Sequence, residues 1–251
     1  MKRFLIILFF GGLTQTVSSQ TVKTTLTYSV NDAAKRTNKS PVLIMLHGYG
    51  SNETDLFDIS KAIDSRFITF SLRAPIEVGE GGYCWYILNR VTGQNATYDY
   101  KVAKESATKI LSFISNACKA YNVDSTQVYL MGFSQGAIMS FELALSAPKK
   151  IRGILALSGR LMEESKSVKT NWDLVSKVKV FMAHGNSDNV IKIHEAEKAS
   201  AFFKEKKVSD LTYKTYEMPH TICGAELNDI KSWLTKAISP DKKTEQKKAV
   251  K

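Results

Sequence analysis

The chain has 251 residues, of which 43% are hydrophobic, 10% aromatic and 24% charged. This length suits one large domain or two small ones, and the composition excludes a disordered, collagen-like or mucin-like protein, while three cysteines are too few for a disulfide scaffold. The formal net charge is +11, but outside the two ends of the chain the basic residues are scattered and not interleaved with aromatics, so we expect no nucleic-acid partner.

The first nineteen residues follow the pattern of a secretory signal peptide. Lys2 and Arg3 precede the apolar segment Phe4–Phe10, and small and polar residues continue to Gln20. Seven consecutive apolar residues lack the alternation of a half-buried strand, and no run of 18 apolar residues follows that could span a bilayer. We therefore expect residues 1–19 to be removed from a periplasmic or secreted protein that has no stable membrane insertion.

Short apolar runs then alternate with helical patterns along the chain. Several runs are apolar at every position, as parallel strands covered by helices on both faces must be. The predicted strands are Val42–Leu46, Phe67–Phe70, Val128–Met131, Ile154–Leu157, Val178–Ala183 and Leu211–Glu217. Four helices are predicted. The first begins after the capping residue Asp99, the second runs from about residue 135 until Pro148 ends it, and the last two begin near Ile193 and near Leu227.

This order of elements predicts an α/β sandwich with a mostly parallel sheet and helices on both faces. No internal repeat or central linker divides the chain, so we expect a single domain over residues 20–238. The segment 239–251 is rich in lysine, contains Pro240 and has no large apolar residue apart from Val250, so we expect a disordered tail.

One predicted strand runs into Gly132-Phe133-Ser134-Gln135-Gly136, and a predicted helix follows directly. Gly-x-Ser-x-Gly in this strand-turn-helix context is typical of a nucleophilic serine. The sharp turn needs glycines on both sides because a Cβ there would collide with the neighbouring elements. The serine hydroxyl then lies above the sheet at the N-terminus of a helix, where the helix dipole favours developing negative charge. Ser134 is therefore the predicted nucleophile.

A serine hydroxyl needs a base to accept its proton, and in this kind of fold the acid and the histidine follow the serine in chain order. Asp188 and His220 each come just after a predicted strand, so both should lie at the edge of the sheet where Ser134 lies. Asp188 would orient the imidazole of His220. We expect His194 to be exposed on a helix and His184 to shape the turn before Asp188. No histidine spacing supports a zinc site, and the sequence predicts neither a metal ion nor an organic cofactor.

Acyl transfer also needs two backbone N–H groups directed at the oxyanion of the tetrahedral intermediate. The amide of Gln135, directly after the serine, should supply one. The glycine-rich segment Leu46-His47-Gly48-Tyr49-Gly50, at the end of another predicted strand, should supply the second.

Together these motifs resemble the phospholipase/carboxylesterase family of serine hydrolases, the branch that includes the acyl-protein thioesterases. The matching pieces extend over almost the whole body of the chain: Leu46–Gly50, Gly132–Gly136, His184-Gly185 with Asp188, and His220 followed by Cys223 and Glu226-Leu227. The resemblance implies an α/β-hydrolase fold, a triad of Ser134, Asp188 and His220, and an oxyanion hole formed by the amides of Tyr49 and Gln135.

The chain departs from the family pattern at positions that bear on substrate choice. Tyr49 stands where the family often has Leu, Ser51 where it often has Asp, Lys192 where Pro is common, and Pro219 where Gly usually precedes the histidine. None of these is the nucleophile, acid or base. The preferred acyl length and leaving group therefore stay open.

The long connection Ala74–Tyr98 has no clear periodicity but carries several aromatic residues. By the resemblance, Trp85 is a candidate wall of the substrate pocket; the alternative is an aromatic side chain that pins the loop to the body of the domain. Cys84 and Cys223 could approach each other near the site, although for Cys223 we favour an unpaired buried thiol.

The sequence thus predicts an exported serine carboxylic-ester hydrolase that works through an acyl-serine intermediate. The expected substrate is a small-molecule ester or one linked to lipid or polysaccharide, and the oligomeric state is left open. Alternatives within the class are a thioesterase, a lysophospholipase and a feruloyl- or acetyl-type esterase. The predicted signal peptide argues against intracellular acyl-protein substrates. The alternative from a different class is a non-catalytic binding protein with the α/β-hydrolase fold.

Overall fold

The computed structural model describes residues 21–89 and 97–239. The predicted signal peptide lies outside these residues, as does the predicted tail apart from its first residue. No helix in the described ranges is both long and apolar enough to cross a bilayer.

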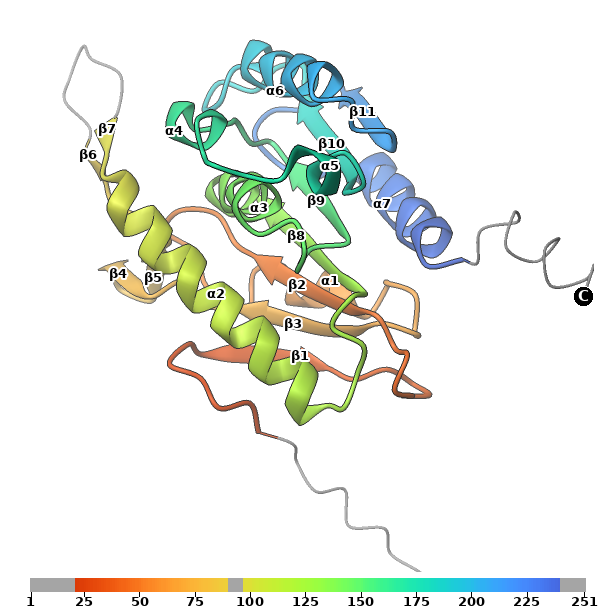
Figure 1. The fold of residues 1–251 in the computed structure, drawn as a ribbon. Helices are drawn as coiled ribbons and strands as arrows, with labels where there is room; N and C mark the ends of the chain where they lie inside the picture. The colour runs from red at the N-terminus through yellow and green to blue at the C-terminus, as the bar shows by residue number, and fades with distance from the viewer. Residues whose placement is uncertain (1–20, 90–96, 240–251) are drawn as a thin grey trace, which may run out of the picture.

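A seven-stranded sheet runs through the centre of the molecule (Figure 1). Its strand order is β1-β3-β2-β8-β9-β10-β11, and every neighbouring pair is parallel except β1 with β3. The strands are β1 (Tyr28–Asn31), β2 (Val42–Leu46), β3 (Ile68–Leu72), β8 (Val128–Phe133), β9 (Gly153–Leu157), β10 (Lys179–Gly185) and β11 (Leu211–Tyr216). The mostly parallel sheet predicted from the sequence is confirmed, and the antiparallel edge strand β1 is an addition to it.

β2 is apolar at every position because both faces of the sheet are buried there. In β2, Val42, Ile44 and Leu46 belong to one hydrophobic cluster, whereas Leu43 and Met45 belong to the cluster on the opposite face. Successive side chains of a strand point to opposite faces, so an unbroken apolar run fills two cores at once.

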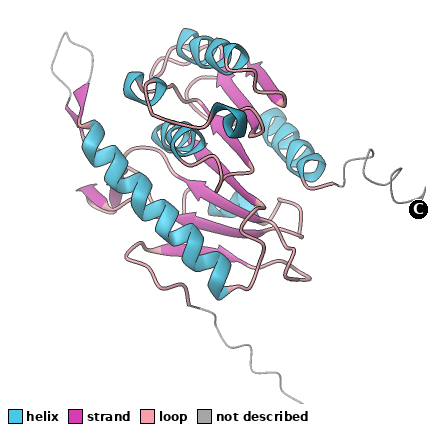
Figure 2. Ribbon diagram, viewed as in Figure 1, coloured by secondary structure: helices cyan, strands magenta, loops and turns pink. Residues whose placement is uncertain are grey.

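Helices cover the two faces unequally (Figures 1 and 2). Besides strand residues, the larger hydrophobic cluster contains buried residues of α2, α3, α5 and α6. The smaller cluster contains buried residues of α7 and of the segments on either side of α1. The helices are α1 (Phe57–Ser60), α2 (Tyr100–Ala120), α3 (Gln135–Ser146), α4 (Glu163–Lys166), α5 (Trp172–Val175), α6 (Ile193–Glu205) and α7 (Gly224–Ala237). As predicted, Asp99 caps α2, where its carboxylate accepts a hydrogen bond from the Lys101 amide at 2.8 Å.

The connection between β3 and α2 contains two small hairpins beside the main sheet. They pair β4 (Ile76–Gly79) with β5 (Gly82–Cys84), and β6 (Leu88–Asn89) with β7 (Thr97–Tyr98). A short bridge from Ser51 to Tyr83 ties the first hairpin to the segment after β2. The described parts of this aperiodic segment therefore form paired strands beside the main sheet.

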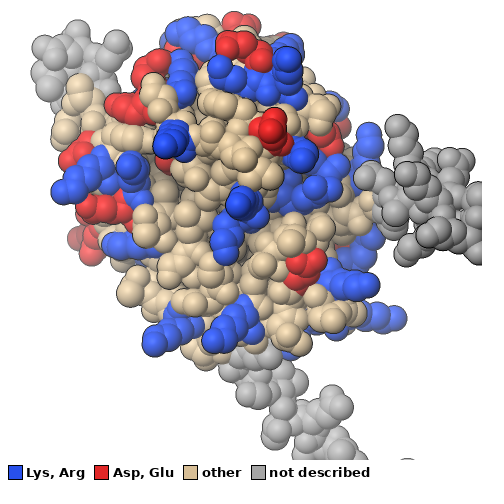
Figure 3. All heavy atoms as spheres, viewed as in Figure 1, with Lys and Arg blue, Asp and Glu red and all other residues tan. Residues whose placement is uncertain are grey.

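Four strands end at the same edge of the sheet and carry the residues singled out in the sequence. Tyr49 follows β2, Ser134 follows β8, Asp188 follows β10, and His220 follows β11. The carboxyl ends of parallel strands are where ligand sites form in α/β proteins. On the face seen in Figure 3, Lys and Arg side chains are spread over the surface with Asp and Glu between them.

The first turn of α7 buries a carboxyl group, which makes stability depend on pH. Glu226 is fully buried, and neither of its oxygens has a hydrogen bond of normal geometry within the described chain. Burial, only partly offset by the nearby backbone N–H of Cys223, raises the pKa of Glu226 to about 7 from 4.5. Unfolding therefore releases a proton between these pH values, so the free energy of unfolding falls as the pH rises from about 4.5 to 7.

Replacing Glu226 by glutamine should remove this penalty. We expect Glu226→Gln to raise the free energy of unfolding at pH 8 by roughly 3 kcal/mol more than at pH 4.5. The reason is that the pKa of Glu226 is about 2.5 units higher in the folded state than in the unfolded state. Urea unfolding at the two pH values measures this difference. The exposed Glu105 on α2 provides the matched control, Glu105→Gln, for which the difference should vanish. Equal effects of Glu226→Gln at both pH values would contradict the assignment.

Candidate active site

Ser134 lies at the sharp turn between β8 and α3. Its φ of 53° and ψ of −113° lie in a region that residues other than glycine rarely adopt. The amide of Ser134 donates to the Leu157 carbonyl at the end of β9, at 2.8 Å, which ties the turn to the neighbouring strand. A strained backbone held in this way is common at functional sites.

The two glycines of the motif allow this turn by letting backbones approach closely. A Cβ on Gly132 would lie 2.1 Å from the carbonyl oxygen of Gly136. A Cβ on Gly136 would lie 1.9 Å from the carbonyl oxygen of Leu46. The first glycine therefore closes the turn on itself, and the second brings the start of α3 against the end of β2. The predicted steric reason for Gly-x-Ser-x-Gly holds at both positions.

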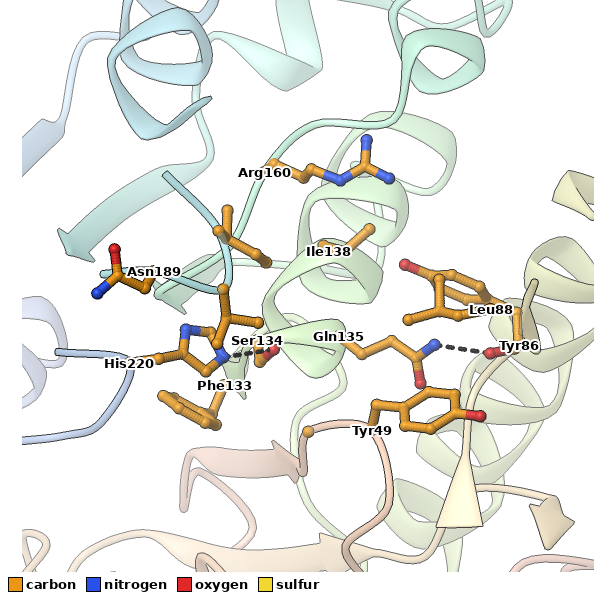
Figure 4. A pocket seen from close by; sticks show the side chains of 13 residues that line it. Tyr49, Tyr86, Leu88, Phe133, Ser134, Gln135, Ile138, Arg160, Asn189 and His220 are labelled. Atoms are coloured by element: carbon orange, nitrogen blue, oxygen red, sulfur yellow. Dashed lines mark hydrogen bonds between the residues drawn. The ribbon is translucent and has the colours of Figure 1, made fainter. Parts of the chain in front are cut away.

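Ser134, His220 and Asp188 lie in a hydrogen-bonded line, of which Figure 4 shows the bond between Ser134 and His220. His220 Nε2 is 2.9 Å from Ser134 Oγ, and His220 Nδ1 is 2.6 Å from Asp188 Oδ2. A carboxylate only accepts, so Nδ1 carries the proton and Nε2 is free to accept from the serine hydroxyl. The three side chains come from loops after β8, β11 and β10 and are separated by 32 to 86 positions in the chain.

The carboxylate of Asp188 is buried and held from several sides. Its Oδ1 accepts from the amides of Val190 and Ile191, at 2.8 and 2.9 Å. These two bonds fix the plane of the carboxylate, so Oδ2 is directed at His220. The orienting group for the imidazole is thus itself oriented by the backbone of its own loop.

His184 supports the same loop from the end of β10. Its Nε2 lies 2.7 Å from the carbonyl of Ile191 and 3.3 Å from Asp188 Oδ2. Because only an N–H can pair with a carbonyl, the proton of His184 is on Nε2. The expectation that His184 shapes this turn agrees with these contacts, although it lies on the strand and not in the loop. His194 is exposed on α6, as expected.

The amides of Tyr49 and Gln135 are available for a substrate oxygen. Neither N–H donates to an acceptor in residues 21–89 or 97–239. The Gln135 amide is the first of α3, so it has no partner within the helix. The Gln135 side chain makes separate contacts with the backbone of a distant loop. Its Oε1 accepts from the Trp85 amide at 2.8 Å, and its Nε2 donates to the Tyr86 carbonyl at 2.7 Å.

His47 holds the loop that carries the Tyr49 amide. Its Nδ1 is 2.7 Å from the Gly48 carbonyl, and its Nε2 accepts from the Ala74 amide at 3.0 Å. Burial is the main reason that the pKa of His47 lies below its usual value, so the ring is neutral with its proton on Nδ1. The Gly48 carbonyl and the Tyr49 N–H belong to one planar peptide, so fixing the first fixes the second. The sequence motif contained His47, but nothing in its spacing indicated this role.

A cavity of about 500 Å³ opens in front of Ser134 (Figure 4). Its walls are mainly apolar and include one cation, Arg160. The lining residues are Gly48, Tyr49, Tyr86, Leu88, Phe133, Ser134, Gln135, Ile138, Arg160, Asn189, Val190, Ile191 and His220. A pocket with apolar walls and few polar groups is typical of small-molecule sites.

Trp85 does not line this cavity, which corrects its prediction as a pocket wall. Its side chain is fully buried behind the wall, and its indole N–H donates to the His47 carbonyl at 3.0 Å. The neighbouring Tyr86 lines the cavity instead. Trp85 fits the alternative given above, an aromatic side chain that pins the loop to the body of the domain.

The three cysteines are unpaired. Cys84 is buried and forms no bridge to Cys223. Cys223 is unpaired, as we favoured, but it is half-buried and not fully buried. Cys118 packs in the core of α2. Within the described part of the chain, no group of three or more His, Cys, Asp or Glu side chains could hold a metal ion.

Comparison with known proteins gives the same family from sequence and from structure. The phospholipase/carboxylesterase family model matches residues 30–238. Acyl-protein thioesterase 1 of Mycosarcoma maydis is 26% identical over 217 residues, which cover 78% of this chain and 90% of that protein. Acyl-protein thioesterase 1 of Kluyveromyces lactis is 27% identical over 225 residues, which cover 84% of this chain and 97% of that protein.

Solved structures share the fold. The Bacillus cereus carboxylesterase superposes with a TM-score of 0.73 at 22% identity, covering 86% of this chain and 96% of that chain. Zea mays acyl-protein thioesterase 2 superposes with a TM-score of 0.69 at 17% identity, covering 85% and 99%. These likenesses confirm the predicted α/β-hydrolase fold, and the sequence relatives favour an enzyme over a non-catalytic binding protein. The chain belongs to the phospholipase/carboxylesterase family and is a serine ester hydrolase.

Proposed function

We propose that the protein is an exported carboxylesterase that cleaves its substrate through an acyl-Ser134 intermediate, with Asp188 and His220 completing the triad. The observation that carries this proposal is the line of two hydrogen bonds from Asp188 Oδ2 through His220 to Ser134 Oγ, at 2.6 and 2.9 Å. Both lie within the range that proton transfer between a nucleophile and its base requires.

The first half-reaction transfers the acyl group to the enzyme. Ser134 Oγ attacks the ester carbonyl carbon while its proton passes to His220 Nε2. The carbonyl oxygen becomes an oxyanion, which accepts from the amides of Tyr49 and Gln135. When the tetrahedral intermediate collapses, the C–O bond to the alcohol breaks and His220 returns its proton to the leaving oxygen. Asp188 stabilises the imidazolium without taking its proton.

The second half-reaction releases the acid. Water loses a proton to His220 Nε2 and attacks the acyl-enzyme carbonyl, and the same two amides receive the second oxyanion. Collapse breaks the bond to Ser134 Oγ, which regains its proton from His220. All steps use residues of this chain and water, so no metal or organic cofactor is required.

A second candidate is thioester hydrolysis by the same residues. The fungal relatives that cover most of this chain carry the name acyl-protein thioesterase 1. A thiolate leaving group needs less help from a general acid than an alkoxide, so the machinery above would serve both reactions. Tyr49 and Lys192 depart from the family pattern and lie at or beside the pocket, where a change of substrate would be expected.

Export rests on the N-terminal sequence alone. We propose that residues 1–19 are a signal peptide and that the mature enzyme begins at Gln20, because a basic start and a short apolar run precede small and polar residues. The mature protein would then act outside the cytoplasm, on small-molecule esters or on esters linked to lipid or polysaccharide.

One labelling experiment tests both parts of this proposal. A fluorophosphonate probe should label the purified protein once, on Ser134, because only an activated serine attacks the phosphorus. Peptide mass spectrometry locates the label, and the intact mass of the native protein shows where the chain begins. A label on another residue, or none, would overturn the assignment of the nucleophile. A native chain that retains Met1 would overturn export while leaving the catalytic proposal intact.

A further inference from the structure

Arg160 is the single cation in the wall of the cavity in front of Ser134 among the described residues. Arg160 follows β9. In Figure 4, Ile138 lies between Ser134 and Arg160, and Phe133 lies on the other side of Ser134. Hydrolysis of a neutral ester does not need a guanidinium at this place, because the mechanism above uses only Ser134, His220, Asp188 and two amides. The residue is therefore available for recognition of the substrate.

The Arg160 guanidinium is held in position without an ion pair among the described residues. It lies over the ring of Tyr98, 5.3 Å from the ring centroid. The Tyr98 hydroxyl in turn donates to Glu164 Oε2 at 2.6 Å, which fixes the ring. Arg160 itself forms no ion pair with any carboxylate of the described chain. An arginine held in place without an anionic partner can give its N–H groups to a ligand.

Arg160 also lies where a second cavity joins the first. This neighbouring cavity of about 630 Å³ shares Arg160, Val190 and Ile191 with the pocket at Ser134. It extends along the start of α6, where the helix dipole adds partial positive charge. A substrate could therefore place its ester at Ser134 and extend past Arg160 into the second cavity.

The charges that line the second cavity favour an anion. Besides Arg160 its wall contains Lys192 and Lys198, against Glu163 and Glu195. Both carboxylates already have partners: Glu163 pairs with Lys166 at 2.7 Å, and Glu195 pairs with Lys198 at 2.7 Å and with His194 at 2.9 Å. Lys192 donates only to the neutral side-chain oxygen of Asn189 among described groups. Arg160 also interacts electrostatically with Glu195, which offsets part of its charge. With Arg160, Lys192 and Lys198 against Glu163 and Glu195, the wall nevertheless carries a net positive charge.

We propose that Arg160 recognises an anionic group, a carboxylate or a phosphate, on the ester that Ser134 cleaves. This inference rests on the proposed function and adds the substrate class: esters that carry a negative charge in the acyl or alcohol half. A guanidinium binds both oxyanions in a bidentate manner. The contact is the same in the ground state and in the transition state, so it acts mainly on KM and on kcat/KM.

Matched pairs of esters measure this preference. For the acyl half the pair is mono-p-nitrophenyl glutarate and the neutral p-nitrophenyl hexanoate, read by release of p-nitrophenol. For the alcohol half the pair is 1-butyrylglycerol 3-phosphate and 1-butyrylglycerol, read by release of butyrate. The ratio of kcat/KM between the charged and neutral members reports recognition of the anion, independent of the enzyme's general activity.

We expect Arg160→Gln to lower this ratio at least tenfold in one of the two pairs, since a charge-assisted hydrogen bond contributes about 1.5–3 kcal/mol. The loss should appear as a higher KM for the charged ester, with less than threefold change for the neutral one. Arg160→Lys should restore part of the ratio because it keeps the charge without the bidentate geometry. Lys204→Gln, which removes an exposed cation of α6 that lines neither cavity, should leave the ratio unchanged.

The outcomes separate this inference from the proposed function. A pair that responds to Arg160→Gln identifies the half of the substrate that carries the anion and supports the inference. If the wild-type protein hydrolyses the neutral esters and neither ratio changes in Arg160→Gln, the anion site is wrong and the esterase stands. If the wild-type protein hydrolyses none of the four esters and Ser134 takes no fluorophosphonate, the proposed function itself fails.

Discussion

Ser134→Ala is expected to lower kcat for p-nitrophenyl hexanoate by roughly 10⁴- to 10⁶-fold. Without Oγ there is no atom to form the acyl-enzyme, and the proton-accepting Nε2 of His220 loses its partner at 2.9 Å. The rate that is left would come from substrate binding and the two amides acting on water. Steady-state kinetics at one pH, with active-site titration of the wild type, measure the loss.

Ser158→Ala provides a matched control for this variant. Ser158 also has a positive φ, of 51°, directly after a neighbouring strand, and its hydroxyl is buried with no partner in the described chain. Its replacement removes the same atom from a similar backbone, so kcat should change less than threefold. Both variants should unfold at nearly the temperature of the wild type. Turnover by Ser134→Ala within a hundredfold of the wild type would assign the nucleophile to another residue.

Asp188→Asn is expected to lower kcat by about 10⁴-fold through the tautomer of His220. The amides of Val190 and Ile191 donate to Oδ1, so the asparagine keeps its carbonyl oxygen there and turns its NH₂ group toward His220. An NH₂ group donates, which forces His220 Nδ1 to accept and moves the imidazole proton to Nε2. A protonated Nε2 cannot take the proton of Ser134. The kinetics of ester hydrolysis measure the loss, and NMR of the imidazole nitrogens reports the tautomer.

Asp210→Asn serves as the control for loss of a negative charge. Asp210 makes a partly exposed ion pair with Lys179 at 2.8 Å, away from the site, and exposed pairs contribute little to stability. Its replacement should leave kcat within twofold. If Asp188→Asn retained more than a tenth of the wild-type kcat, the orientation of His220 would have to come from another group.

The residues of the proposed triad were predictable because their positions depend on chain order. Parallel strands place their carboxyl ends at one edge, so a residue just after β8, β10 or β11 must lie near that edge. Ser134, Asp188 and His220 each have that position, and their chain order leaves few other pairings. The strand β1 was missed because its short alternating sequence, Tyr28–Asn31, has only two large apolar residues.

The residues that shape the pocket were not predictable in this way. Trp85 and Tyr86 are adjacent aromatics in a segment without periodicity, and nothing in their sequence says which one faces the cavity. The side chain of Gln135 decides this, because its two hydrogen bonds to the backbone of residues 85 and 86 hold that loop against α3. Such contacts join positions about 50 apart in the chain and follow no periodic pattern.

The sequence by itself determined the fold class and placed Ser134, Asp188 and His220, the proposed triad, at one edge of the sheet, because these features follow from local backbone chemistry and strand direction. The tertiary structure decided that His47 fixes the peptide before Tyr49, that Tyr86 and not Trp85 lines the cavity, and that Arg160 lies at the junction of two cavities. Loops lack the repeating hydrogen bonds of helices and strands. Their side chains therefore take positions that only packing between distant segments selects.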